Sequence, residues 1–208
     1  MMLSASGLAI HALWALRWDG LGPRKTSSKA TDKLPDSCSV VVCCHNEEAR
    51  IADFHQALLP ALVHAESCGM HVQVVAVNHG STDGTAQALE ALSDRSGWIV
   101  VHQARTRPSK KEALEAGMLA ATGESVVVTD LDCTPLSPEW LELMLRGAAA
   151  QWDVCVGLSL PVRGAGRLHA LQQLEAERTA QKAVGAVVRA RPYLGFGRNM
   201  AFTQEMWV

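Results

Sequence analysis

The sequence predicts one α/β domain with a mostly parallel β-sheet flanked by helices. Short β-branched segments alternate along the chain with longer segments of helical spacing, which is the pattern of strands joined by crossover helices. The segment Val126–Val128 is continuously apolar, as expected for a strand buried on both faces. The chain has 208 residues, of which 48% are hydrophobic and 19% charged. This composition excludes a disordered chain and suits one well-buried domain.

The elements follow one another in a regular order. Strands are predicted at Ser39–Cys43, Val72–Val77, Trp98–His102, Ser125–Thr129 and Val154–Leu160. Helices are predicted at Glu47–Ala65, Asp83–Leu92, Lys110–Ala121, Pro138–Gln151 and Gly166–Val188. In a parallel sheet of this kind the ligand crevice lies beyond the carboxyl ends of the strands. Residues at those ends are therefore the candidates for function.

Charge and cysteine content narrow the function classes. With 19 Lys and Arg against 21 Asp and Glu, the net charge is −2. There is no general basic excess to bind a nucleic-acid backbone, so we expect no nucleic-acid partner. The six cysteines show no paired spacing, which favours a reduced, cytoplasmic setting over a disulfide framework.

The N-terminal residues differ from the rest of the chain. Residues 1–18 form a hydrophobic segment, and residues 19–37 read as a Gly/Pro/Ser/Lys-rich linker before a domain at 38–208. The apolar run is shorter than the ~20 residues of a spanning helix. Three interpretations stay open: a clipped membrane anchor, an interfacial helix, and a leader that is packed or disordered. The basic flank on its C-terminal side would keep the domain cytoplasmic at a membrane surface.

Two strand ends carry polar loops. The first strand ends in His45-Asn46-Glu47-Glu48, which helix capping alone explains, with Asn46 as the N-cap. The second ends in residues 78–85, NHGSTDGT. This glycine-flanked loop before a helix is able to offer N–H and hydroxyl groups to a nucleotide. The alternative is a turn in which Asp83 or Thr82 caps the next helix.

The fourth strand ends in two carboxylates. Asp130 and Asp132 directly follow the valine strand, where buried carboxylates are costly unless they are paired or bind metal. Oxygen ligands at this spacing suit Mg²⁺ or Mn²⁺, which bridge nucleotide phosphates. A D-x-D pair is weak evidence alone, and its position at a strand end strengthens it.

Taken in order, these segments resemble the family 2 glycosyltransferases of the GT-A (Rossmann-like) fold. The matching segments read VVVCCHNEE (40–48), VVAVNHGSTDGT (74–85), KKEAL (110–114), ATGESVVVTDLDC (121–133), PLSPEW (135–140) and YLGFGRNMAF (193–202). The resemblance extends from about residue 39 to residue 208. It implies a metal-dependent enzyme that transfers a sugar, with inversion, from a nucleotide-diphosphate-sugar donor to a saccharide or lipid-linked acceptor.

The resemblance also implies roles for individual residues. Donor-binding residues would be Asn46, Glu47, Asn78, Asp83, Lys110 and Asp130. Asp130 and Asp132 would hold Mg²⁺ or Mn²⁺, with Asp132 the direct ligand, and the first strand would lie beside the fourth. The acceptor side would include Gly195, Gly197, Arg198 and Asn199.

Two departures from the family pattern matter. The family has Asp-Asp where this chain has Asn78-His79, so a charged acceptor for the base of the expected UDP-sugar is replaced by a neutral amide. The family's catalytic carboxylate and a basic-aromatic motif follow the glycine-rich segment. Here only TQEMWV (203–208) follows, with Glu205 its single acid. We therefore expect the chain to be C-terminally incomplete, with the carboxylate that acts as the catalytic base outside it.

Three rival functions stay open beside sugar transfer. The first is an inactive fragment that binds nucleotide or membrane without transfer. The second is a nucleotidyltransferase on the same sheet, which lacks support because no Gly-rich basic loop follows the first strand. The third is a zinc site among Cys43, Cys44, His45, His79 and Cys133. Adjacent cysteines on a strand point to opposite faces, which counts against zinc.

One region is locally basic. Between residues 163 and 198 the basic residues are Arg163, Arg167, Arg178, Lys182, Arg189, Arg191 and Arg198. A solvated helix face explains them most simply. The functional alternative is contact with anionic lipid headgroups or a diphosphate-lipid acceptor.

Overall fold

The protein is described from a computed structural model that covers residues 34–103, 109–149, 154–162, 164–189, 191 and 193–207. The hydrophobic segment predicted at 1–18 and most of the linker at 19–37 lie outside the described residues. The chain divides into two compact units. One contains the sheet (Lys29–Ser159 and Phe196–Val208), and the other, in its described part, spans Leu160–Gly195.

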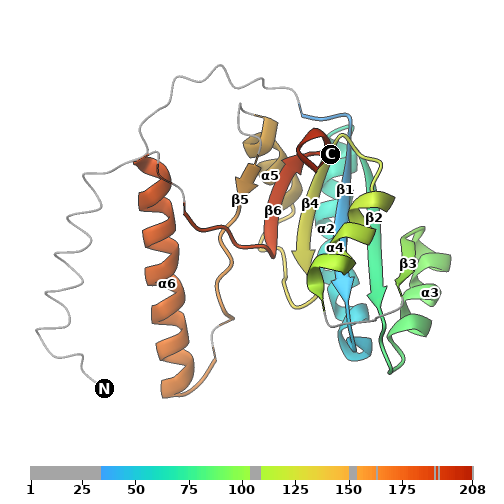
Figure 1. The fold of residues 1–208 in the computed structure, drawn as a ribbon, viewed down its shortest axis with the longest axis horizontal. Helices are drawn as coiled ribbons and strands as arrows, with labels where there is room; N and C mark the ends of the chain where they lie inside the picture. Colours follow the sequence, from blue (N-terminus) through green and yellow to red (C-terminus); the bar gives the residue numbers. More distant parts are fainter. Residues whose placement is uncertain are drawn as a thin grey trace, which may run out of the picture. The chain divides into compact units, whose positions relative to one another are not determined.

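A six-stranded sheet forms the first unit, and the predicted α/β class is confirmed. Its strands are β1 (Ser37–Cys44), β2 (His71–His79), β3 (Ile99–Gln103), β4 (Ser125–Asp130), β5 (Val154–Val156) and β6 (Asn199–Thr203). The strand order is β3-β2-β1-β4-β6-β5 (Figure 1). Strands β3, β2, β1 and β4 pair in parallel, and β6 is antiparallel to both β4 and β5. The expected neighbourhood of the first and fourth strands is thus confirmed.

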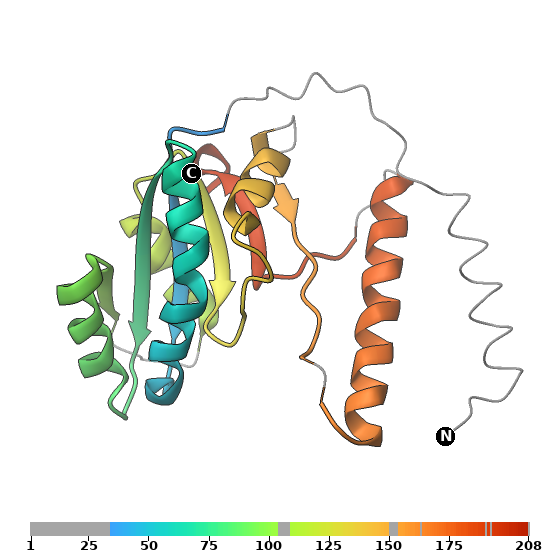
Figure 2. The same cartoon turned by 180° about the vertical axis from the view of Figure 1, so that it is seen from behind.

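The helices cover both faces of the sheet. They are α2 (Glu48–Ser67), α3 (Thr85–Ser96), α4 (Lys110–Ala120) and α5 (Trp140–Ala149), with a short 3-10 turn, η1 (Gln204–Trp207), after β6. Helices α2, α3 and α5 contribute to the larger apolar cluster, and α4 to the smaller one on the opposite face. Figure 1 shows α4 in front of the sheet, and Figure 2, from behind, shows α2 in front.

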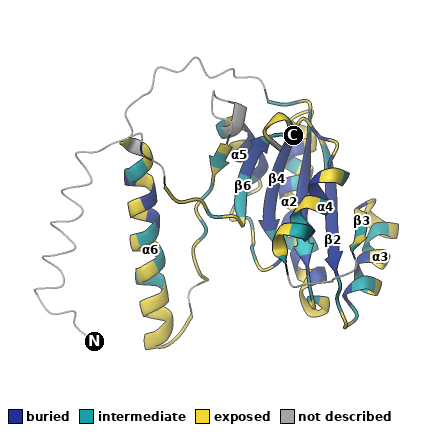
Figure 3. Ribbon diagram, viewed as in Figure 1, coloured by how far each residue is buried: buried dark blue, intermediate teal, exposed yellow. Residues whose placement is uncertain are grey.

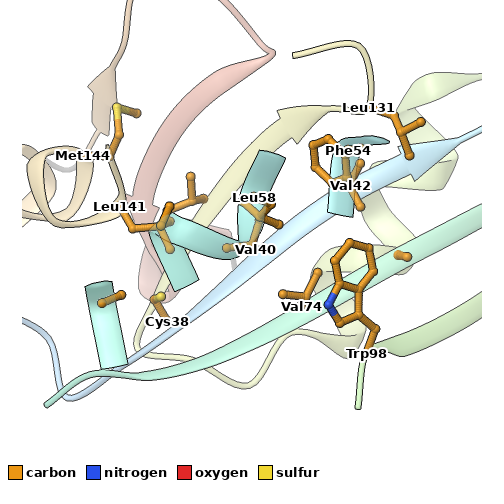
Figure 4. Close-up of a cluster of buried hydrophobic side chains, with 14 of the residues drawn as sticks. Cys38, Val40, Val42, Phe54, Leu58, Val74, Trp98, Leu131, Leu141 and Met144 are labelled. Carbon is orange, nitrogen blue, oxygen red and sulfur yellow. The ribbon is translucent and has the colours of Figure 1, made fainter. Parts of the chain in front are cut away.

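The core consists of strand side chains that pack against side chains of the helices. Figure 3 shows the central strands as buried. In the larger cluster, drawn in Figure 4, Val40 and Val42 of β1 meet Phe54 and Leu58 of α2. The Phe54 and Trp98 rings are 6.2 Å apart with their planes at 79°, the edge-to-face arrangement that aromatic pairs favour. This packing fixes β1, and with it the residues at its carboxyl end.

The last strands differ from the prediction. The predicted strand Val154–Leu160 ends at Val156, and β6 was not predicted at all. From Gly157 onward the chain leaves the sheet, with the Gly157 N–H donating to the Asn199 carbonyl at 2.8 Å. A Cβ on Gly157 would lie 2.2 Å from Nδ2 of Asn199, so any larger residue here would have to displace the Asn199 side chain.

Helix α6 (Arg167–Val188) belongs to the second unit, as a single long helix where one was predicted. Several large apolar side chains on it are exposed: Leu168, Leu171, Val184 and Val187. Among the residues that the structure describes, no helix combines the length and the apolar character needed to cross a bilayer.

Candidate functional site

A cleft lies at the carboxyl ends of the parallel strands. It has a volume of about 360 Å³. Its lining residues come from β1, β2, β4, α4 and the loops between them: Cys43, Cys44, His45, Glu47, His79, Ser109, Lys110, Ala113, Asp130, Leu131 and Asp132. The strand register explains this convergence, because Cys43 pairs with Asp130 on one side and Cys44 with Asn78 on the other.

The predicted metal ligands lie in this cleft. Asp130 is the last residue of β4, and Asp132 follows in the exposed turn. Both line the cleft. Two carboxylates two residues apart offer the oxygen ligands that Mg²⁺ and Mn²⁺ prefer, and solvent reaches the site to supply further ligands. The donor set therefore fits a hard divalent cation.

Lys110 is the cationic partner of this pair. It is the first residue of α4, and its Nζ contacts Oδ1 of Asp130. The preceding Ser109 caps the helix by accepting a hydrogen bond from the Glu112 N–H at 3.4 Å. The residues 109–112 read Ser-Lys-Lys-Glu, the sequence of a capping box. This signal fixes where α4 begins, and so where the lysine stands.

The loops after β1 and β2 cap each other's helices. The Glu47 N–H donates to Oγ1 of Thr85 at 2.8 Å, and the Gly84 N–H donates to Oε2 of Glu48 at 3.0 Å. The Glu48 N–H also donates to Asp83 Oδ2 at 3.3 Å. The two helix N-termini are thus satisfied reciprocally, each by side chains from the other loop.

Asn46 is not the N-cap that the sequence suggested. Glu47 occupies that position without a side-chain cap bond. Asn46 instead adopts a left-handed conformation with φ 56°, which asparagine tolerates better than most residues. Its Oδ1 accepts from the Thr82 N–H at 2.8 Å. The tertiary pairing of the two loops overrides the local capping pattern.

Asp83 is held as a carboxylate. It accepts hydrogen bonds from the Thr85 hydroxyl at 2.6 Å and from the Thr85 N–H at 3.0 Å. These bonds, the hydroxyl bond above all, lower the pKa of Asp83, because they favour its charged form. Neither Asp83 nor Asn46 is among the cleft-lining residues, and both support the loop that borders it.

The neighbours Asn78 and His79 have different surroundings. The Asn78 amide is engaged, with Oδ1 accepting from the Ser81 N–H at 3.3 Å and Nδ2 lying 3.2 Å from Nδ1 of His102. His79 is 5% exposed and lines the cleft. Within the described part of the chain, neither of its ring nitrogens has a hydrogen-bond partner. Buried polar atoms of this kind are costly unless something pairs with them.

The thiols at the strand ends have pKa values raised above the usual range of cysteine, so they stay protonated at neutral pH. Burial raises the pKa of Cys43 to about 11 and that of Cys44 to about 12. Burial and the Asp132 and Asp130 charges raise the pKa of Cys133 to about 11. Among the described residues, the strand-end cysteines and histidines do not gather three ligand atoms around one point. The structure gives the zinc alternative at this edge no support.

Acceptor-side candidates fall in both units. Gly195 ends the second unit, whereas Gly197, Arg198 and Asn199 belong to the first. The Asn199 side chain is occupied: Trp140 Nε1–H donates to its Oδ1 at 3.0 Å, and its Nδ2 donates to the Leu158 carbonyl at 3.3 Å. Asn199 therefore ties β6 to α5 and to the chain after β5.

The family comparison matches this arrangement. The sequence profile described as Glycosyl transferase family 2 matches residues 39–203, which include β1 from its third residue, the whole of β2 to β6 and every cleft-lining residue. The chain belongs to glycosyl transferase family 2. The expected family resemblance is confirmed.

Two curated relatives of this family 2 chain carry the same name. An undecaprenyl-phosphate 4-deoxy-4-formamido-L-arabinose transferase of Pseudomonas paraeruginosa is 31% identical over 120 residues, which is 57% of this chain and 34% of the relative. The protein of the same name from Pseudomonas aeruginosa LESB58 is 30% identical over the same shares. The matched part of the chain thus spans about a third of the length of these relatives.

Solved structures share the fold of this family 2 chain. A mannosyltransferase from Pyrobaculum calidifontis, in complex with GDP-Man and Mn²⁺, has a TM-score of 0.63 at 21% identity, covering 98% of this chain and 55% of the other. Glucosyl-3-phosphoglycerate synthase from Mycobacterium tuberculosis, in complex with Mn²⁺, UDP and its product, has a TM-score of 0.52 at 23% identity. That match covers 86% of this chain and 60% of the synthase.

The remaining carboxylate candidate of the family 2 chain, Glu205, lies at the wrong end of the sheet. It stands in η1, directly after β6, whose Thr203 pairs with Ser125 at the start of β4. The cleft lies at the other end of β4, where Asp130 stands. Five residues of extended strand separate these ends by about 17 Å. Glu205 is therefore too far away to act at the cleft.

Proposed function

We propose that this chain binds a nucleotide-diphosphate-sugar and a divalent cation for transfer of the sugar to an acceptor. The observation that carries the proposal is the gathering of Asp130, Asp132 and Lys110 in one cleft, at the strand ends where α/β sheets bind ligands. Membership of glycosyl transferase family 2 supports sugar transfer as the reaction at this cleft.

The proposed roles follow from charge and position. Asp130 and Asp132 would hold Mg²⁺ or Mn²⁺, and the bound cation would supply positive charge to the departing nucleoside diphosphate. Lys110, beside Asp130, is within reach of the same phosphates and orients them. An oxygen of the acceptor then bonds to the anomeric carbon from the face opposite the diphosphate as the bond from that carbon to the diphosphate oxygen breaks, so the configuration is inverted and the nucleoside diphosphate leaves. The Mn²⁺ complexes of the mannosyltransferase and the synthase support the choice of cation.

On the nucleoside side, Glu47 and His79 line the cleft, while Asn46, Asn78 and Asp83 hold the surrounding loops. We assign the contact with the base to the imidazole of His79, which has no partner in the part of the chain that the structure describes, rather than to the engaged amide of Asn78. A UDP-sugar is the proposed donor. The UDP complex of the synthase supports uridine, and the GDP-Man complex of the mannosyltransferase makes GDP the comparison ligand.

The proposed acceptor is a lipid-linked phosphate at the cytoplasmic face of a membrane. The name of the curated relatives, which refers to undecaprenyl phosphate, supports this class. Arg178 and Lys182 on α6, with exposed Leu168 and Leu171 on the same helix, supply the cationic and apolar groups that lipid headgroups attract. Charge reversal of Arg178 and Lys182 is expected to abolish binding to anionic vesicles, and retained binding would exclude this role.

Calorimetric titration with UDP tests the donor site. We expect binding that requires Mn²⁺, and at least tenfold weaker binding by Asp132→Asn, because the substitution removes a charged oxygen ligand of the cation. Asp132 is exposed, so the variant should keep its fold. Asp94→Asn on the exposed side of α3 removes the same charge away from the cleft and should bind as the unaltered protein does. A UDP affinity that is the same without Mn²⁺ and in Asp132→Asn would overturn the proposal.

The second candidate is a chain that binds the nucleotide without transferring sugar. The position of Glu205 at the opposite end of β4 from the cleft favours it where the acceptor is a hydroxyl, because inverting transfer to a hydroxyl requires a carboxylate within reach to take the proton. Sugar transfer or donor hydrolysis by the chain, followed with a radiolabelled UDP-sugar, would exclude this candidate. Metal-dependent binding without turnover would support it.

A further inference from the structure

Three side chains of different chemistry meet far from the cleft. His64 and Cys68 lie one turn apart near the C-terminal end of α2, where an i, i+4 pair shares one helix face. Glu142 approaches them from the first turn of α5. Among the described residues, these form the group of histidine, cysteine and carboxylate side chains whose ligand atoms converge, all within 4.8 Å of one another.

The spacing of these atoms is close to that of one face of a metal tetrahedron. Nε2 of His64 lies 2.7 Å from Oε2 of Glu142, and Sγ of Cys68 lies 3.7 Å from that nitrogen and 3.9 Å from that oxygen. Zinc bonds of about 2.0–2.3 Å at tetrahedral angles separate such ligands by about 3.4–3.6 Å. A shift of less than about 1 Å per pair therefore admits the ion.

The surroundings hold the ligands in place. Nε of Arg146 donates to Oε1 of Glu142 at 2.8 Å, so the carboxylate turns its other oxygen, Oε2, toward His64 and Cys68. The Cys68 N–H donates to the carbonyls of His64 and Ala65 at 3.1 Å each, which anchors the thiol at the helix end. A partner that orients a ligand in this way is a common feature of metal sites.

The site is open to solvent on one side. Cys68 is exposed, while His64 and Glu142 are partly buried. Solvent access gives the ion an entry path and a water molecule as fourth ligand. Soft thiolate and imidazole ligands favour Zn²⁺ over Mg²⁺ or Mn²⁺, so the site differs in metal preference from Asp130 and Asp132.

We propose that His64, Cys68 and Glu142 form a Zn²⁺ site that ties the end of α2 to α5. It is separate from the cleft, because the other end of α2 borders the cleft loops and a helix of this length spans about 30 Å. The ion cross-links two helices that both pack on the sheet. The ion stabilises the fold and takes no part in the donor chemistry. The proposal of this site is therefore tested independently of the proposed function.

Cobalt substitution of the full chain tests the site. One equivalent of Co²⁺ should give a thiolate-to-cobalt absorption band that Zn²⁺ removes, since oxygen ligands such as Asp130 and Asp132 give no such band. Cys68→Ser should abolish the band. Cys155→Ser, which removes a half-buried thiol elsewhere, should leave it unchanged.

A second variant guards against loss of folding. Glu142→Gln keeps the shape of the side chain and should weaken Zn²⁺ binding at least tenfold, while circular dichroism shows the fold retained. At the same concentration, Zn²⁺ should raise the Tm of the unaltered chain by more than that of Glu142→Gln. Absence of the cobalt band in the unaltered chain, or its persistence in Cys68→Ser, would overturn the proposal.

Discussion

The ammonium group of Lys110 forms an ion pair with Oδ1 of Asp130, joining the first residue of α4 to the last residue of β4. The Lys110 side chain is 58% exposed and that of Asp130 27%, so solvent screens the pair and a lysine is able to turn from it toward a ligand. The pair thus places a protein cation in competition with a metal cation for the same carboxylate.

Lys110→Met should separate two effects of the lysine: its competition with the metal for Asp130 and its attraction for the diphosphate. We expect Mn²⁺ alone to bind up to about fivefold more tightly, because a screened ion pair contributes up to about 1 kcal/mol and no longer competes. UDP in the presence of Mn²⁺ should bind about tenfold more weakly, because the diphosphate loses a cationic partner. Lys111→Met, on the exposed side of the same helix turn, is the matched control. Parallel changes in both affinities would contradict this assignment.

His79→Phe tests the unpartnered imidazole. Because neither ring nitrogen has a partner among the described residues, replacing the imidazole with an apolar ring should change the free energy of unfolding by less than about 1 kcal/mol. If the imidazole meets the base, UDP affinity should fall about tenfold. Asn78→Asp is the companion variant, and a large gain in UDP affinity there would instead assign the base to position 78.

Asn46 should matter for stability through both its backbone and its side chain. Asn46→Ala places a Cβ-bearing residue without a polar side chain at φ 56° and removes the bond to the Thr82 N–H. We expect a loss of about 2 kcal/mol in urea unfolding. Asn46→Gly relieves the backbone strain and should lose about half as much. Equal losses in the two variants would show that the backbone conformation does not matter.

Asp83 should make stability depend on pH. Its pKa is lowered in the folded protein, so its contribution is fully present above the ordinary aspartate pKa of about 4. It is lost as the pH falls below that value through the lowered pKa. Asp83→Asn should therefore be less stable than the unaltered chain at neutral pH, with the difference shrinking in acid. Asp94→Asn controls for net charge, and a difference that stays constant with pH would refute the assignment.

Local patterns predicted much of this molecule. Valine runs located β1, β2 and β4, helical spacing located α2, α4 and α6, and the strand-end position singled out Asp130 and Asp132. These signals are local because each element carries its own periodicity. The neighbourhood of the first and fourth strands followed from the family resemblance and is confirmed.

The rest depends on contacts between distant segments. Strand β6 is five residues long and was missed because its antiparallel pairing with β4 has no local signature. The N-cap role predicted for Asn46 was wrong because the loop that Asn46 pairs with is more than 30 residues away, at Thr82. The engagement of Asn78 with His102 was hidden for the same reason.

The insertion of β6 between β4 and β5 has a consequence for the order of assembly. Strand β5 has its backbone partner in β6, which follows it in the chain. As the protein emerges from the ribosome, residues 154–156 therefore wait until residues 199–203 have been synthesised, and until then β4 is an open edge. An interruption of synthesis between β5 and β6 would leave a valine-rich edge strand exposed to pairing with other chains. Completion of β6 closes that edge.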